Sequence, residues 1–157
     1  MTLWDCLVRY VQNDLLITLS VMGGGMVIAG WHPGKPTRYV RMALSFLVGM
    51  LWMILLRLPT GDGSFYALLV IGRYLGLYLL SVLAVHYACD VGGYSALYAV
   101  TISYSIQSAC EHLIEIPRKL IPDFPLLLDR GLLFLLMLGC FAAFCTVAVW
   151  HGKYRRY

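Results

Sequence analysis

The sequence predicts an all-α membrane protein, a bundle of about five transmembrane helices forming one domain over residues 1–157. Hydrophobic residues make up 61% of the chain, and its mean hydropathy is +0.76. Soluble domains contain only about 45–50% apolar residues. A helix needs about 20 mostly apolar residues to cross a bilayer. The sequence has such stretches at residues 11–30, 39–58, 65–89, 94–113 and 132–150.

The elements follow from the residues at their ends. The first stretch comes after Asp5 and Arg9 rather than after a basic leader, so we expect it to remain as a helix instead of being cleaved. Pro33 and Pro36 separate it from the second stretch, because proline lacks the backbone N–H that a helix needs. Glycines flank Asp62 before the third stretch, and residues 90–93 predict a tight turn before the fourth.

The connection between the fourth and fifth stretches is the longest, residues 114–131. It contains Pro117, Pro122 and Pro125 together with charges of both signs. We expect a loop here, with residues 117–122 resting on the outer membrane surface.

Basic residues near the helix ends predict the orientation, because cytoplasmic loops are enriched in Lys and Arg. The first loop and its border carry Lys35, Arg38 and Arg41, and the tail carries Lys153 and two further arginines. An odd number of helices places both groups in the cytoplasm. Five helices therefore give an N-terminus outside and a C-terminus inside.

A polar group is predicted within the helices. Arg73 lies about 12 Å from the outer end of its helix at 1.5 Å per residue, a depth at which a charge normally has a partner. Tyr104, Gln107 and Glu111 share one face of the fourth helix at a similar depth. These residues, with Tyr66 as a neighbour, predict an outward-facing pocket for an anionic or peptide ligand. The alternative is a structural ion pair or an arginine that snorkels to the interface.

Small residues predict close helix packing. Gly72 and Gly76 form a GxxxG pattern, and Gly25 with Ala29 forms a related one. Such patterns let helix backbones approach each other within one bundle or across a homodimer.

A second chemistry is conceivable at the inner end of the third helix. His86 and Cys89 are three residues apart, so the imidazole could activate the thiol, and Asp90 could orient the histidine. Membrane peptidases that mature signalling peptides use a cysteine and a histidine at such a boundary, although at a wider spacing than here, so a small intramembrane cysteine peptidase that processes a signal peptide is one alternative. The alternative is an interfacial histidine beside a packing cysteine.

Other classes are not favoured. The net charge of +4 comes from residues at helix ends rather than from a basic patch with aromatics, so we expect no nucleic-acid partner. The histidines are dispersed, the cysteines form no CxxC motif, and no phosphate-binding loop occurs. We therefore expect neither a metal nor an organic cofactor.

Two runs of residues carry a family resemblance, 89–98 (CDVGGYSALY) and 104–113 (YSIQSACEHL). They resemble the N-terminal membrane region of sensor histidine kinases with a GHKL-type ATPase domain, common in Firmicutes. The shared features are a cysteine before a short turn, an Ala-Leu pair that opens the next helix, and a Tyr-x-x-Gln before its end. The basic first loop and the aromatic-basic tail, residues 154–157, also fit.

The resemblance implies a sensor of a two-component system in the cytoplasmic membrane of a bacterium, which detects an external ligand such as a peptide and relays the signal through the last helix. Such kinases continue into a dimerisation helix and an ATP-binding domain, which this sequence does not contain. We therefore expect no catalysis by the chain as given, and a response regulator as partner only if a kinase domain follows. The alternatives are the peptidase and a non-catalytic scaffold or transporter subunit.

Overall fold

The computed structural model describes residues 3–30, 36–57, 64–121 and 125–154. The chain divides into unit 1, Met1–Ile102, and unit 2, Ser103–Tyr157. The described residues are helical, with short turns and no strand, as expected for an all-α protein. The helices are α1 (Leu3–Asn13), α2 (Leu15–Thr18), the π-helix η1 (Leu19–Gly23), α3 (Gly24–Ile28), α4 (Pro36–Leu55), α5 (Ser64–Cys89), α6 (Gly93–Leu120) and α7 (Leu126–Tyr154).

The helix predicted over residues 11–30 is present, but its start and its course differ from the expectation. Helical structure already begins at Leu3, and the chain bends by 59° between α1 and the segment α2–η1–α3. The bend is at Asp14, whose backbone carbonyl accepts a hydrogen bond from the Thr18 hydroxyl at 3.0 Å. The carboxylate of Asp14 is directed to Arg57, a partner far away in the sequence. A polar side chain in the helical ladder and a π-helical turn are both common causes of such bends.

The next helices agree better with the sequence. α4 begins at Pro36, a residue favoured in the first helical turn because its missing N–H is not needed there. α5 spans Ser64–Cys89, one residue longer than predicted at its start. The chain then turns at Asp90, which adopts a φ of +54°, a conformation that aspartate tolerates better than most residues.

The predicted loop over residues 114–131 is largely helical, which corrects the sequence-based expectation. α6 continues to Leu120 with Pro117 inside its last turn, and α7 already begins at Leu126. A proline near a helix end removes one backbone hydrogen bond, a loss that the surrounding side-chain contacts can offset. Only residues 122–124 of this connection lie outside the described residues.

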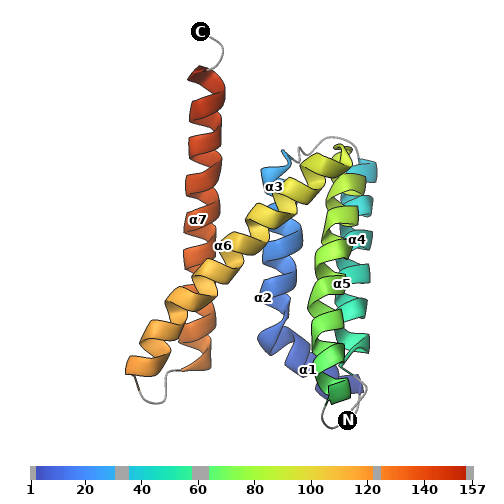
Figure 1. Cartoon of the computed structure of the whole chain (residues 1–157), viewed down its shortest axis with the longest axis vertical. Helices are drawn as coiled ribbons and strands as arrows, with labels where there is room; N and C mark the ends of the chain where they lie inside the picture. Colours follow the sequence, from blue (N-terminus) through green and yellow to red (C-terminus); the bar gives the residue numbers. More distant parts are fainter. Residues whose placement is uncertain (1–2, 31–35, 58–63, 122–124, 155–157) are drawn as a thin grey trace. The chain divides into compact units, whose positions relative to one another are not determined.

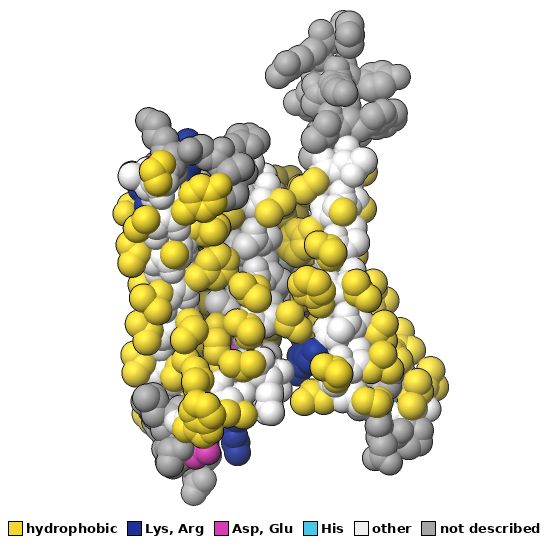
Figure 2. Space-filling view, turned by 180° about the vertical axis from the view of Figure 1, so that it is seen from behind, with side chains coloured by type: hydrophobic (Ala, Val, Ile, Leu, Met, Phe, Trp, Pro, Cys, Tyr) yellow, Lys and Arg dark blue, Asp and Glu magenta, His cyan; other side chains and the backbone are white. Residues whose placement is uncertain are grey.

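Three helices are long and apolar enough to cross a membrane: Pro36–Leu55, Phe65–Cys89 and Leu126–Val147. The bent pair Trp4–Asn13 and Leu15–Ile28 passes the same test together, which gives up to four spans among the described residues. α6 is long enough but more polar. Hydrophobic side chains cover most of the helical surface seen in Figure 2, with charged side chains in a few places. These are the features of a membrane protein.

Unit 1 contains two apolar clusters. α4 and α5 lie side by side, and α2–η1–α3 packs against them, as Figure 1 shows. One cluster gathers α3, α5 and the start of α6 around Met26, Val85 and Val100. The other joins α1 to α4 and α5 through Cys6, Tyr10, Met53, Ile54 and Leu77.

Candidate functional site

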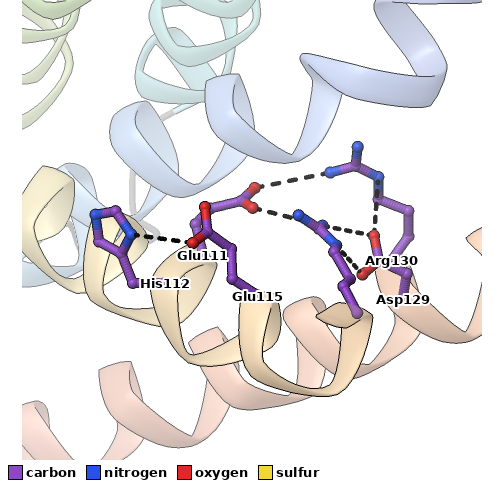
Figure 3. Close-up of polar contacts among 6 residues, drawn as sticks. Glu111, His112, Glu115, Asp129 and Arg130 are labelled. Atoms are coloured by element: carbon purple, nitrogen blue, oxygen red, sulfur yellow. Dashed lines mark hydrogen bonds and ion pairs between the residues drawn. The ribbon is translucent and has the colours of Figure 1, made fainter. Parts of the chain in front are cut away.

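Four charged side chains meet where α6 ends and α7 begins, all within unit 2. They are Glu111 and Arg118 of α6 and Asp129 and Arg130 of α7. We call this group the hairpin cluster. Figure 3 shows how the carboxylates and guanidinium groups face one another between the two helices.

Helical spacing places the members of the cluster. Glu111 and Arg118 are seven residues apart, about two helical turns, so they lie on one face of α6. Asp129 and Arg130 belong to the start of α7, whose first turn is favourable for a carboxylate because of the helix dipole. The continuation of α6 through Pro117 brings Arg118 opposite Asp129.

The shortest contacts join Arg118 to Asp129. Nε of Arg118 donates to Oδ1 at 2.5 Å, and Nη2 donates to Oδ2 at 2.6 Å. This bidentate arrangement is among the strongest hydrogen-bonded pairs in proteins. The hydrogen bonds with Asp129 raise the pKa of Arg118 above its ordinary value, so its charge is permanent at physiological pH.

Longer contacts close the cluster into a ring. Glu111 lies 3.6 Å from Arg118 and 3.7 Å from Arg130. Arg130 also lies 3.9 Å from Asp129. Each carboxylate therefore has two cationic neighbours and each guanidinium two anionic ones, and the ring has no net charge. A neutral ring lowers the cost of holding charges at a membrane helix end.

Beside the ring, α6 carries a more exposed charged edge. Glu115 lies 4.0 Å from Nδ1 of His112 and 3.7 Å from Nζ of Lys119. The Lys119 side chain is 79% exposed, whereas that of Asp129 is 6% exposed. Exposed pairs of this kind contribute little to stability. The ring, not this edge, therefore fixes the hairpin.

Unit 1 has a buried ion pair of its own at the bend between α1 and α2. Oδ2 of Asp14 lies 2.5 Å from Nη2 of Arg57, with side chains 2% and 12% exposed. Among the described residues, neither this Oδ2 nor Nε of Arg57 has a hydrogen bond of suitable geometry. Charge attraction, rather than aligned hydrogen bonding, holds this pair.

The residues of the predicted ligand pocket fall in both units. Tyr104, Gln107 and Glu111 lie on α6 in unit 2, where Gln107 is buried and Tyr104 exposed. Arg73 and Tyr66 lie on α5 in unit 1. The pocket that would join them remains a prediction.

Arg73 is partly satisfied by its neighbours on α5. Its Nη2 donates to the hydroxyl of Tyr74 at 3.1 Å, and the guanidinium lies 4.9 Å from the centre of that ring. Its buried Nε has no hydrogen-bond partner among the described residues. One donor of a charged group is thus left for a further acceptor.

The predicted packing residues differ in their surroundings. A Cβ added to Gly76 would overlap with the Trp52 indole, whose Nε1 donates to the Arg73 carbonyl at 3.1 Å. A Cβ on Gly72 would meet no atom within 4 Å. At Gly25 it would lie 3.1 Å from side-chain atoms of Val85 and Val100, and Ala29 packs against the same apolar cluster.

The predicted Cys89–His86 pair makes other contacts. The Cys89 thiol lies 3.8 Å from the carbonyl of Met26, and Nδ1 of His86 lies 2.5 Å from the carbonyl of Val91. Asp90, which was expected to orient His86, accepts a hydrogen bond from Arg41 at 2.8 Å. No hydrogen bond joins Cys89 to His86 in the described part of the chain, so the geometry gives the peptidase hypothesis no support.

An open depression of about 490 Å³ lies beside this turn. Its lining residues are Arg41, His86, Tyr87, Asp90, Val91 and Gly92. Arg41 stacks 4.8 Å from the centre of the Tyr87 ring and is held by Asp90. The guanidinium of Arg41 is therefore occupied by contacts within the protein.

Sequence reasoning missed Arg118, Asp129 and Arg130 as site residues. The charges of both signs in residues 114–131 were visible, but Pro117 indicated a loop, which hid the spacing of Glu111 and Arg118. The buried role of Asp14 and Arg57 was also missed, because nothing local links residues so distant in sequence. Comparison of the chain with protein-family models, curated proteins and solved structures finds no match.

Proposed function

We propose that this chain is a membrane signalling domain that detects an external ligand and relays the event through α7. The observation that carries the proposal is the hairpin cluster. It ties the end of α6 to the first turns of α7, and α7 then runs through Tyr154 toward the C-terminal end of the chain. Any event that rearranges these charges changes how α7 is held at its start.

The topology of the proposal is five crossings in a bacterial cytoplasmic membrane, with the N-terminus outside and the C-terminus inside. In that arrangement α6 runs outward and the hairpin cluster lies at the outer surface. The basic residues Arg38 and Arg41 then lie at the inner surface, in accord with the enrichment of Lys and Arg in cytoplasmic loops.

The ligand in this proposal is an anionic or peptide molecule held by Arg73, Gln107 and Glu111, with Tyr104 and Tyr66 as aromatic neighbours. Two observations support it. Nε of Arg73 is buried without a hydrogen bond among the described residues, and Gln107 is a buried amide on α6, which crosses the membrane in this proposal. Buried polar groups in such helices generally serve a pathway or a ligand.

The output in this proposal belongs to a GHKL-type sensor kinase, to which the chain contributes the membrane part. Such a kinase passes phosphate to a cytoplasmic response regulator, which is a partner only where a kinase domain follows. A homodimer in the membrane would bring two such chains together.

The test joins the full chain, at its C-terminal end, to a cytoplasmic histidine-kinase reporter. Cells are exposed to spent culture medium of the source organism, with and without protease treatment. We expect the untreated medium to change reporter phosphorylation, and Arg73→Ala and Gln107→Ala to reduce that response at least tenfold. Arg9→Ala, an exposed residue of α1, serves as the matched control and should respond like the unaltered chain.

Equal responses of Arg73→Ala, Gln107→Ala and the unaltered chain, at equal amounts in the membrane, would contradict ligand recognition by these residues. A response that survives protease treatment would contradict a peptide ligand.

A further inference from the structure

The first helix of unit 1 presents three distinct faces along its length. One face is buried in the protein through Cys6 and Tyr10, which pack against α4 and α5. A second face is polar and exposed. It carries Asp5, Arg9, Gln12 and Asn13.

The third face of α1 is apolar and exposed. Trp4, Val8 and Val11 are spaced i, i+4, i+7 and therefore form one stripe. Their exposed fractions are 70%, 37% and 54%. A tryptophan beside a polar face is typical of helices that lie in the membrane interface, where an amphipathic ring has one apolar and one wet surface.

The length of the following segment agrees with this placement. α2, η1 and α3 together cover Leu15–Ile28, which is about 21 Å at 1.5 Å per residue. The hydrocarbon core is about 30 Å thick. The difference between these two lengths is about 9 Å. An interfacial helix is embedded by about 5–10 Å, so a crossing that starts from α1 needs no longer segment.

The direction of α1 also agrees. It bends away from the crossing by 59°, and membrane helices themselves tilt by about 20° on average. In Figure 1, α1 runs across the ends of α4 and α5 rather than along them. α1 contacts α4, on which Leu51 and Leu55 are also exposed apolar residues.

We infer that α1 is an interfacial helix, embedded in the boundary between headgroups and acyl chains through Trp4, Val8 and Val11. The occupant of this face is the phospholipid bilayer. Asp5 and Arg9 balance each other on the polar face, so the contact does not require anionic lipid. The bend at Asp14, held by Arg57, is then the point where the chain enters the membrane.

The test measures tryptophan depth in the full chain, reconstituted into phosphatidylcholine vesicles. The lipids carry bromine, which quenches tryptophan fluorescence, either near the headgroup or near the bilayer centre. The difference between the unaltered chain and Trp4→Phe isolates the native Trp4. Val8→Trp and Val11→Trp, each added to Trp4→Phe, report further along the stripe. Gln12→Trp in the same background is the control on the polar face.

We expect the shallow bromine to quench positions 4, 8 and 11 more strongly than the deep one, while aqueous iodide quenches position 12. Depth should change by at most about 5 Å from position 4 to 11, since a 59° bend leaves half of the helical rise along the crossing. Adding phosphatidylglycerol should leave the depths unchanged.

A steady change of about 10 Å over these seven residues would show a continuous crossing and overturn the inference. Absence of quenching by either brominated lipid would show that protein covers the stripe, and would overturn it equally. The native Trp4 measurement decides the matter even if a tryptophan introduced at position 8 or 11 disturbs folding.

Discussion

Unit 1 holds the bend of its first helix with one ion pair, Asp14 and Arg57, whereas unit 2 holds its hairpin with the ring of four charges in the hairpin cluster. The Asp14–Arg57 pair is the more buried of the two sites. Removing one partner of an isolated buried pair leaves the other charge without compensation. In the ring, each charge keeps a second neighbour when one is lost. We infer that the bend tolerates the loss of one charge less well than the hairpin does.

The two units also differ in their apolar packing. Both apolar clusters, built around residues such as Val85 and Leu77, belong to unit 1. In α7 only 11% of the membrane-spanning window is buried, compared with 28% in α5. Within unit 2, the described contacts between α6 and α7 include the charged ring of the hairpin cluster. In the proposed function, this ring is the part of unit 2 through which a change reaches α7.

Removing the isolated pair should have the largest effect. Asp14→Ala leaves Arg57 buried without its carboxylate, and we expect the free energy of unfolding to fall by about 3–5 kcal/mol. The measurement is a denaturant titration of the full chain in mild detergent micelles. Arg9→Ala, at an exposed position of α1, is the control and should change stability by less than about 0.5 kcal/mol. Equal effects of the two substitutions would contradict a structural role for the pair.

Removing one member of the ring should cost less. Asp129→Ala ends the bidentate contact with Arg118, but both arginines keep Glu111, so we expect a loss of about 1–3 kcal/mol in the same titration. Lys119→Ala removes only an exposed pair and should cost at most about 0.5 kcal/mol. A loss for Asp129→Ala that exceeds the loss for Asp14→Ala would reverse the comparison.

Apolar packing in unit 1 can be tested with two glycines one helical turn apart. Gly76→Ala would force Trp52 away from α5, and we expect a loss of about 1–2 kcal/mol from this overpacking. Gly72→Ala meets open space, so it should be neutral or slightly stabilising. The thermal unfolding midpoint in detergent separates the two. Similar midpoints for both variants would mean that Trp52 of α4 does not pack as closely against Gly76 of α5 as the structure shows.

We expect the smallest effect on stability from a crosslink between two cysteines of unit 2. The thiol sulfurs of Cys110 on α6 and Cys140 on α7 lie 3.9 Å apart, so a mild oxidant should join them with little movement. Mass spectrometry of the unreduced chain should find this crosslink. Cys140→Ser is the control that should abolish it. A crosslink between Cys110 and Cys145 instead would show that α6 and α7 pair in a different register.

The sequence predicted the helices where an apolar run lies between clear breakers, as in residues 65–89. It failed where a side-chain contact decides the backbone. The bend at Asp14 coincides with an ion pair to Arg57, and the extension of α6 through Pro117 coincides with the contact of Arg118 with Asp129. The local amino-acid composition does not show which residues, far apart in the sequence, come together in space. The pocket around Arg73 and Gln107 stays a prediction for the same reason, since its members belong to different units.

The most direct test of the account compares reporter output with stability in the two ion sites. The full chain, joined to the histidine-kinase reporter, is measured for phosphorylation per folded molecule in the membrane, for Asp129→Ala and Asp14→Ala. We predict that Asp129→Ala changes output severalfold although it costs less stability, because it releases the start of α7. Asp14→Ala should lower the amount of folded protein and leave output per molecule unchanged. Output that follows the loss of stability in both variants would contradict a signalling role for the hairpin cluster.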